Sequence, residues 1–386
     1  MAQRIAVWQV LPHLALGGAT KVVLWLAKGL DRERFAVTVV AGTEEKAEGS
    51  LQGELAAVGA EFLPLPVLRR DIAPRDDWAA GRELCRLLRE RRPDIVHAHG
   101  SKALILAGLA ARATGVRAIH TAHGWSFHDH QGGGARWLQV SLHRWALRPA
   151  AAIVAVSAAT RDKGLAAGIG RPEQYRVIYP GAELERFALP PATRTEVRAE
   201  LGLPVGAPVV GSVMRLCDQK APLDFVAAAR QVAARCPEVR FLVVGGGPLD
   251  GAVRAAVTAA GLDGRLILTG PRDDVPRLLA ACDVFALASL WEGLPIVYAE
   301  ASAAGLPCVG TDVGGTAEII EPGVTGLLTP PANPQALADG ILQVLADPGA
   351  GRRMGENGRR KVYAMGFAVP DVVARYEALY HEVAGR

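Results

Sequence analysis

The stretch 283–300 reads Asp-Val-Phe-Ala-Leu-Ala-Ser-Leu-Trp-Glu-Gly-Leu-Pro-Ile-Val-Tyr-Ala-Glu. Its first half is a short apolar run, which is typical of a strand buried in a parallel sheet. Pro295 suits the first position of a helix, because its φ is fixed and it has no N–H to leave unpaired. The stretch therefore predicts a strand, a tight loop and a helix, which together form one βα repeat.

The same alternation runs through the chain twice. The first series has strand-like runs near 4–10, 36–41, 94–98, 117–121 and 152–156, and the second near 208–213, 240–244, 265–268, 284–287 and 307–310. Helical segments such as 18–30 and 79–91 lie between the strands, and the proline-bearing segment 188–192 reads as a linker. Two series of βα units predict an α/β protein with two doubly wound Rossmann-like domains, 1–187 and 193–364. Ligands of such sheets bind beyond the carboxyl ends of the strands, so we expect the site in the cleft that the domains face.

Composition fits a globular chain with a sizeable core. Half of the 386 residues are apolar and 21% are charged, and no apolar run approaches the ~18 residues of a membrane span. The N-terminal residues read as a first strand and lack the layout of a signal peptide. Five scattered cysteines without a CxxC motif indicate reduced thiols in a cytosol.

Charge is divided unevenly along the chain. The first 190 residues carry 25 Lys and Arg against 18 Asp and Glu, together with eight of the nine histidines. In the expected helix 135–149, four side chains share an arc of about 120°, namely Arg136, Trp137, Arg144 and Arg148. This pattern suits an anionic acceptor or a membrane interface, and the alternative is a solvated helix face.

The glutamate loop is a candidate anion site. The amides at the expected helix start, around Leu294, Ile296 and Val297, point out of the helix and favour a phosphate. The carboxylates of Glu292 and Glu300 suit neutral hydroxyls, although acids that merely cap a surface helix would look the same.

Two further loops of the second half suit a diphosphate. Arg215 and Lys220 follow the first strand of this half. The guanidinium of arginine offers a planar fork of donors and the ammonium of lysine a compact positive charge, and both suit a diphosphate. Glycines at 245–247 separate a strand from a helix, so that Gly246 either allows close backbone approach or forms a simple turn.

The first half offers glycines and histidines. Gly17 and Gly18 lie between the first strand and the first helix without the GxGxxG spacing of a dinucleotide site, although Glu44 and Glu45 follow the second strand. The six clustered histidines, His97, His99, His120, His123, His128 and His130, fit no zinc spacing, so we expect no metal. We expect His97 and His99 to pack at a strand end, and His123 to contact a substrate.

Taken together, these motifs resemble the family 4 retaining glycosyltransferases of the GT-B fold along nearly the whole chain. The most specific is Glu292-x7-Glu300 with the following ASAAGLPCVGTDVGGTAEII (301–320), and the next is Arg215-x4-Lys220. The GGA at 17–19, the TAHG loop at 121–124 and VIYPGAELERF at 177–187 agree.

The resemblance implies roles for these residues. Arg215 and Lys220 would hold the donor diphosphate, Glu292 would contact the donor sugar, and Glu300 the ribose. The expected donor-binding set is completed by Gly17, Gly18, Gly246, Arg272, Gly293, Leu294, Pro295, Ile296 and Val297. His123 would meet the sugar from the opposite domain and joins Arg215, Lys220 and Glu292 in the expected catalytic set.

The family also implies a reaction. A nucleotide-sugar, with UDP as the expected nucleotide, would give a hexosyl group to a saccharide or lipid-linked saccharide with retention, without metal or cofactor. The segment 365–386 would return onto the first domain. The stretch 120–128 resembles enzymes that build on lipid-linked carriers, so we expect a cytosolic protein that docks on the inner membrane face and binds no nucleic acid.

Three departures from the family pattern stand out. Pro180 replaces Asn, Ala221 replaces Gly, and Pro295 falls two positions early. A nucleotide-sugar epimerase, a non-enzymatic polyanion- or polysaccharide-binding protein and a dehydrogenase are the alternative functions.

Overall fold

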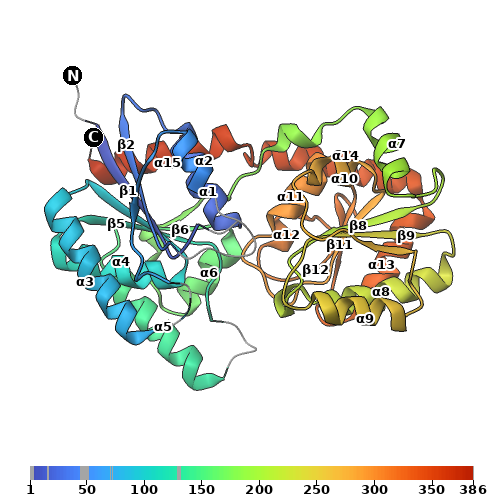
Figure 1. Cartoon of the computed structure of the whole chain (residues 1–386), viewed down its shortest axis with the longest axis horizontal. Coiled ribbons are helices and arrows are strands. Elements are labelled where there is room, and N and C mark those ends of the chain that lie inside the picture. The colour runs from blue at the N-terminus through green and yellow to red at the C-terminus, as the bar shows by residue number, and fades with distance from the viewer. Residues whose placement is uncertain are drawn as a thin grey trace. The chain divides into compact units, whose positions relative to one another are not determined.

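A computed structural model describes residues 4–14, 17–43, 52–69, 71, 73–127 and 132–385 (Figure 1). The chain divides into two compact units. Unit 1 comprises Met1–Gly181 and Val369–Arg386, and unit 2 comprises Ala182–Ala368. Each unit is built on one parallel sheet with helices on both faces, which confirms the expected α/β architecture.

Unit 1 has a seven-stranded sheet in the order β3-β2-β1-β4-β5-β6-β7. Its strands are β1 (Ile5–Leu11), β2 (Phe35–Ala41), β3 (Glu61–Pro64), β4 (Ile95–His99), β5 (Arg117–Ala122), β6 (Ala152–Ala155) and β7 (Tyr175–Val177). The strand order reverses between β1 and β4. The connections that follow these two strands therefore run to opposite sides, and the carboxyl ends of β1 and β4 form the usual place for a ligand in such a sheet. Its helices include α1 (Gly18–Gly29), α2 (Gln52–Ala57), α3 (Pro74–Arg91), α4 (Ser101–Thr114), α5 (Gly133–Leu147) and α6 (Ala158–Ala166).

The two faces of this sheet bury different helices. Along β1, Ile5 and Val7 pack with α1, whereas Trp8 and Val10 pack with α3 and α4. Successive side chains of a strand point to opposite faces, so a residue's parity decides which helix it meets. Gln9 therefore shares the face of Ile5 and Val7.

Helix α15 (Val369–Ala384) belongs to unit 1, although it follows unit 2 in the sequence. Its apolar residues recur every three or four positions and form a stripe along one side of the helix. Within this stripe, Val372, Tyr376 and Tyr380 are fully buried. They pack with Trp25 and other residues of α1 in the same core cluster. Figure 1 shows α15 beside α1, on the same face of the sheet.

Unit 2 has a six-stranded sheet in the order β10-β9-β8-β11-β12-β13. Its strands are β8 (Val209–Val213), β9 (Arg240–Val244), β10 (Leu266–Leu268), β11 (Val284–Leu287), β12 (Cys308–Thr311) and β13 (Gly326–Thr329). Its helices are α7 (Pro191–Glu200), α8 (Pro222–Arg235), α9 (Asp250–Ala259), α10 (Val275–Ala280), α11 (Ile296–Ala303), α12 (Thr316–Ile319), α13 (Pro334–Ala346) and α14 (Pro348–Ala364). The segment expected as a linker at 188–192 runs directly into α7, because Pro190 caps that helix.

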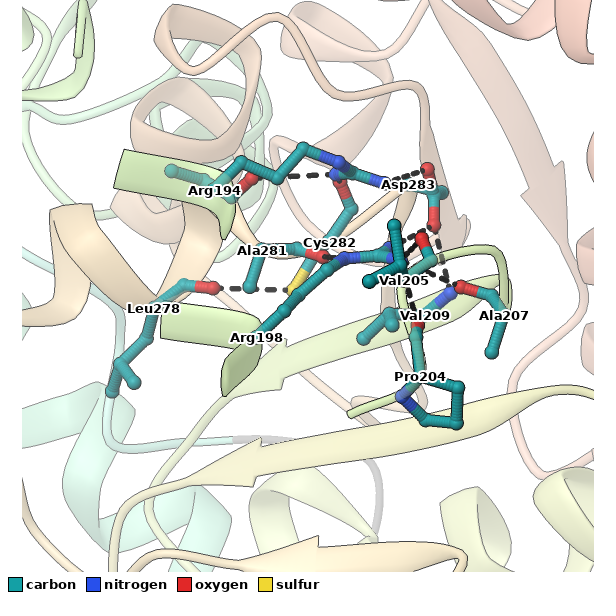
Figure 2. A network of polar contacts seen from close by, with 11 residues as sticks. Arg194, Arg198, Pro204, Val205, Ala207, Val209, Leu278, Ala281, Cys282 and Asp283 are labelled. Atoms are coloured by element: carbon teal, nitrogen blue, oxygen red, sulfur yellow. Dashed lines mark hydrogen bonds and ion pairs between the residues drawn. The ribbon is translucent and has the colours of Figure 1, made fainter. Parts of the chain in front are cut away.

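A buried arginine anchors α7 to the rest of unit 2 (Figure 2). Arg198, whose side chain is 3% exposed, donates to the carbonyls of Ala281 at 3.0 Å and Val205 at 2.7 Å. It also pairs with Asp283 at 2.8 Å, and Arg194 pairs with the same carboxylate at 2.6 Å. Asp283 in turn accepts the N–H of Val209 at 2.8 Å. These contacts fix the amino-terminal ends of β8 and β11, opposite the strand ends that carry the basic loop and the glutamate loop.

Candidate functional site

The candidate site in unit 2 is built from loops that follow parallel strands. Residues 214–217 follow β8, 245–247 follow β9, 289–295 follow β11 and 312–315 follow β12. Backbone hydrogen bonds tie these loops together. The bonds join Leu216 N–H to Gly246 O at 2.9 Å, Leu290 N–H to Gln219 O at 2.8 Å and Gly315 N–H to Gly293 O at 2.9 Å. The carboxyl end of this sheet therefore presents one connected surface.

Lys220 and Glu292 form an ion pair in this surface. Their side chains are 18% and 6% exposed. The amide of Gln219 donates to Glu292 Oε2 at 3.3 Å and to the Trp291 carbonyl at 2.9 Å. The basic loop and the glutamate loop, which sequence analysis singled out separately, thus meet through side chains.

Helix α11 begins at Ile296, one residue later than the sequence predicted. Pro295 is the N-cap, with φ −77° and ψ 99°, and its carbonyl accepts the N–H of Tyr298 at 3.1 Å. The N–H groups of the first helical residues, here Ile296 and Val297, have no acceptor within the helix. Such a helix start is an arrangement that favours an anion. Leu294 is a buried loop residue, and Glu300 lies one turn into the helix.

Two glycines permit this close packing of loops. A Cβ on Gly245, whose φ is +129°, would lie 2.0 Å from the Met214 carbonyl oxygen. A Cβ on Gly314, whose φ is +54°, would lie 2.1 Å from the Glu292 carbonyl oxygen. Any side chain at either position would push the basic loop or the glutamate loop out of place.

The remaining expected donor residues of unit 2 are arginines in different settings. Arg215 is exposed between the buried Met214 and Leu216, so its side chain projects from the loop surface. Arg272 follows β10 and pairs with Asp274 at 2.7 Å and with Glu200 at 3.1 Å. These two carboxylates raise the pKa of the Arg272 guanidinium. Arg272 therefore connects its loop to α7 and α10.

Sequence analysis missed two buried hydroxyl groups beside the site. Ser289 lies two residues after the end of β11 and Tyr298 lies in α11, each 1% exposed. Neither hydroxyl has a hydrogen-bond partner among the residues that the structure describes. Unpaired buried polar groups are rare because each costs free energy, and they concentrate where a ligand completes the pairing. A small hydroxyl residue at a strand end is the only sequence signal for Ser289.

Unit 1 carries the expected glycine pair and His123. Gly17 caps α1 with an extended backbone, and Gly18 is the first helical residue, both exposed after β1. His123 follows β5, and its Nε2 lies 3.0 Å from His99 Nδ1. Burial lowers the pKa of His123 to about 4, so the imidazole is neutral near pH 7.

The histidine group shows no metal-binding arrangement within the described part of the chain. His97, His99 and His120 are fully buried on β4 and β5. No group of three or more His, Cys, Asp or Glu side chains among the described residues could hold a metal ion. His128 and His130, as well as Glu44 and Glu45, lie outside the described residues.

Helix α5 carries an exposed basic and aromatic face. Trp137 and Trp145 are 70% and 52% exposed, and Arg136 and Arg148 are exposed beside them. A shallow hollow of about 300 Å³ is lined by Arg136, Trp137 and Arg144, among others. No described helix of the chain is long and apolar enough to cross a bilayer.

Two doubly wound units, one of which joins a basic loop to a glutamate loop at its strand ends, define a glycosyltransferase of the GT-B class. The solved structure of Anabaena HepE in complex with UDP-glucose is similar, with a TM-score of 0.82 and 26% identity. The match covers 97% of this chain and 99% of that structure.

Sequence comparison gives the family. The model for glycosyltransferase family 4 matches residues 16–186, and the model for glycosyl transferases group 1 matches 193–361. The Escherichia coli UDP-Gal:alpha-D-GlcNAc-diphosphoundecaprenol alpha-1,3-galactosyltransferase is 30% identical over 98% of this chain and 96% of its own length. A GDP-mannose-dependent alpha-(1-6)-phosphatidylinositol monomannoside mannosyltransferase of Mycolicibacterium smegmatis is 31% identical over 71% of this chain and 73% of its own length. The chain belongs to glycosyltransferase family 4.

Proposed function

We propose that the protein moves a hexosyl group from a UDP-sugar to a saccharide or lipid-linked saccharide, with retention of the anomeric configuration. The observation that carries the proposal is the Lys220–Glu292 pair beside the start of α11. The pair places a cation and a carboxylate beside the two amides that begin α11 and have no acceptor within the helix. A sugar bound to a diphosphate requires such a combination.

In this proposal the diphosphate lies against the amides of Ile296 and Val297, with Lys220 and Arg215 around it. Negative charge grows on the diphosphate as the sugar departs, and fixed donors aimed at that charge lower the barrier. A carboxylate only accepts hydrogen bonds. Glu292 and Glu300 therefore bind hydroxyls of the sugar and the ribose and keep away from the phosphates.

The proposed chemistry is a front-face substitution. The bond between the anomeric carbon and the diphosphate oxygen breaks, and the acceptor oxygen bonds to the same face of that carbon. The acceptor's proton passes to the departing diphosphate oxygen. Glu292 is held by Lys220 and Gln219 and is therefore a poor nucleophile, which argues against a glycosyl-enzyme intermediate. The cationic side chains supply the charge that a metal or another cofactor would otherwise provide, so the proposal includes neither.

The relatives support a nucleotide-sugar donor and leave its base to experiment. The E. coli relative is named for UDP-galactose and a diphosphoundecaprenol acceptor, and the Anabaena structure holds UDP-glucose. The mycobacterial relative is named for GDP-mannose. Because the E. coli relative and the Anabaena structure both involve a UDP-sugar, we propose that UDP is the nucleotide of the donor. We also propose that the acceptor is presented at a membrane surface, where α5 docks peripherally from the cytosolic side.

The first test is a thermal-shift screen with UDP-, GDP- and ADP-sugars. A UDP-sugar at 100 times its Kd should stabilise the donor-binding state by about 2.7 kcal/mol. Product analysis by NMR then reads the linkage, and an α-sugar donor should give an α-linked product. Conversion of the donor to an isomeric nucleotide-sugar would indicate an epimerase instead. If no nucleotide-sugar shifts the melting temperature, the proposal fails.

The second test compares two lysines of unit 2. Lys220→Ala should lower turnover by about 10²–10³-fold, the usual cost of removing one donor to a developing anion. Its effect on the free energy of unfolding should stay within about 1.5–3 kcal/mol, the value of a charged hydrogen bond. Lys361→Ala is the matched control. Lys361 is 25% exposed and forms an ion pair with Glu321 at a distance of 3.6 Å, and neither residue belongs to the loops of the candidate site. Near-normal turnover in Lys220→Ala would remove Lys220 from the mechanism.

A further inference from the structure

A continuous line of hydrogen bonds joins His123 to helix α15. His123 Nε2 lies 3.0 Å from His99 Nδ1, and His99 Nε2 lies 2.8 Å from Gln9 Oε1. The amide nitrogen of Gln9 donates to the Tyr380 hydroxyl at 2.8 Å, and this hydroxyl lies 2.7 Å from His97 Nδ1. The half-buried His123, at the end of a strand, is thereby connected through Gln9 to Tyr380 of α15, which lies 371 positions after Gln9 in the sequence.

The fold explains why these side chains meet. Gln9 is paired with His97 in the β1–β4 register, and both point to the face that α15 covers. Gln9, His97, His99 and Tyr380 are all 0% exposed. Buried groups of this kind have no water to exchange with, so each donor and acceptor depends on its neighbour in the line.

The direction of the hydrogen bonds follows from Gln9. Its amide donates to Tyr380, so the phenol proton is left to donate to His97 Nδ1. Its carbonyl oxygen accepts, so His99 carries its proton on Nε2. A neutral imidazole has one N–H and one acceptor nitrogen. His99 Nδ1 is therefore an acceptor, and His123 must supply the proton from Nε2.

This leaves Nδ1 of His123 without a proton. No carboxylate takes part in the line, and burial lowers the pKa of His97, His99 and His123, so the imidazoles stay neutral near pH 7. A turned Gln9 amide would reverse every donor in the line and would place the proton of His123 on Nδ1. The orientation of one buried amide thus decides whether His123 accepts or donates toward a substrate.

We propose that Gln9 and Tyr380 are positioning residues that set the tautomer of His123, so that its Nδ1 accepts a hydrogen bond from a hydroxyl group of the sugar substrate. The substrate side of this inference rests on the proposed function. The tautomer side rests only on the hydrogen bonds within unit 1. A sugar that lacks the hydroxyl, or carries it as a methyl ether, cannot make this contact and should be transferred more slowly.

Helix α15 supplies a matched pair of variants. Tyr380→Phe removes the hydroxyl that joins Gln9 to His97. Tyr376→Phe removes an equally buried hydroxyl on the same helix, which lies 3.2 Å from Thr121 Oγ1. Thr121 Oγ1 also contacts His97 Nε2 at 2.7 Å, on the side of the imidazole away from Gln9. Both changes cost a buried hydrogen bond, but only the first removes the acceptor that orients the Gln9 amide.

The decisive measurement is the ¹⁵N spectrum of the imidazoles in the full chain, in which protonated and unprotonated ring nitrogens are resolved. The His123 signals are assigned by their loss in His123→Asn. Wild type and Tyr376→Phe should show His123 protonated on Nε2, whereas Tyr380→Phe should show a mixture of tautomers. If Tyr380→Phe does not fold, Gln9→Met serves instead, because it keeps the side-chain length and removes both polar atoms.

Activity supplies the second readout. In Tyr380→Phe, kcat/KM for transfer should fall by about tenfold, the lower end of the loss seen when the partner that orients a metal-binding histidine is removed, while Tyr376→Phe stays near wild type. An unchanged His123 tautomer in Tyr380→Phe, or equal losses in the two variants, would overturn the inference. A changed tautomer with unchanged kcat/KM would overturn its substrate half. The spectrum requires no donor, so absence of transferase activity in the wild type would refute the proposed function and leave the tautomer result standing.

Discussion

Ala221, next to Lys220, has a left-handed backbone with φ 43° and ψ 56°. The resemblance to the family led us to expect Gly at this position, and the backbone conformation gives the physical reason. A side chain in this conformation costs roughly 1–2 kcal/mol, whereas glycine costs only the added entropy of the unfolded chain, about 0.4–1 kcal/mol. The departure from the family pattern therefore places strain at the end of the basic loop.

We expect Ala221→Gly to raise the free energy of unfolding by up to about 1.6 kcal/mol, the largest difference between these two terms. Ala332→Gly is the control, because Ala332 has φ 53° on the surface of unit 2 and is far in sequence from the site loops. Urea denaturation measures both. A loss of stability in Ala221→Gly together with a gain in Ala332→Gly would show that packing of the Ala221 methyl group outweighs the backbone strain.

Single residues of the site differ in how far the sequence predicts them. Lys220 and Glu292 carry charge at a recognisable spacing in loops, so their types and positions already indicate a diphosphate and a sugar. The hydroxyl of Ser289 gave only a weak signal, its place at a strand end, and that of Tyr298 gave none, because whether a hydroxyl finds a partner depends on the packing around it. The pairing of Gln9 with Tyr380 was equally invisible, since it depends on strand parity and on where α15 docks.

Helix α5 is the element through which we expect unit 1 to bind an anionic membrane. Each basic residue near such a surface contributes about 1 kcal/mol, so the Arg136→Gln/Arg148→Gln double variant should bind about thirtyfold more weakly. The measurement is co-sedimentation with vesicles that contain phosphatidylglycerol, at low and high salt. The wild type should bind less well at high salt, since its charges are exposed.

The matched control for α5 removes two arginines from another edge of unit 1. Arg4 and Arg32 are exposed at the amino-terminal end of the sheet, so Arg4→Gln/Arg32→Gln should bind vesicles nearly as well as wild type. Equal weakening in both double variants would mean that net charge alone drives binding. Strong binding to vesicles of phosphatidylcholine only would also contradict an electrostatic role for α5.

Most elements were predictable because their patterns are long or strongly apolar. The ten expected strands all form, within one or two residues of the expected ends. The missed strands, β3, β7 and β13, have only three or four residues and lie at sheet edges or near them. Their sequences are too short to show a period, and pairing with a neighbour makes them strands. The one-residue error at α11 arose because Pro295 can serve as N-cap as well as first helical residue.

The two units should differ in their response to acid. All nine histidines lie in the sequence of unit 1, and none lies between residues 182 and 368. Burial lowers the pKa of His97, His99, His120 and His143, and that of His123. Because these folded-state pKa values lie below the unfolded value of about 6.5, the unfolded state binds protons first as the pH falls. Their stabilisation is complete above pH 6.5 and is lost below it.

Each such histidine should cost unit 1 about 1 kcal/mol between pH 6.5 and 5.5. We therefore expect unit 1 to unfold at a higher pH than unit 2. Trp291 is the only tryptophan of unit 2, so tryptophan fluorescence of Trp291→Phe follows unit 1 alone, while far-ultraviolet circular dichroism follows both. Two separate transitions, with the fluorescence change in the first, are the expected result.

His120 provides the control for acid unfolding. Neither of its ring nitrogens has a hydrogen-bond partner among the described residues, and burial lowers its pKa to about 3. His120→Leu removes one titrating group without breaking a described hydrogen bond, so it should shift the first transition to lower pH. Coincident unfolding of both units, or an unchanged first transition in His120→Leu, would contradict the histidine explanation.

The return of α15 to unit 1 has a consequence for biosynthesis. On the ribosome, residues 369–386 emerge only after all of Ala182–Ala368 has been translated. Until then the apolar surface formed by Trp25, Leu26 and Phe35 lacks its cover from Tyr376 and Tyr380. Unit 2 can finish folding while the chain is still being synthesised. Unit 1 cannot, and its exposed apolar surface can be bound by chaperones or can aggregate in the meantime. The order in which the two units complete folding is thus the reverse of the order in which their synthesis begins.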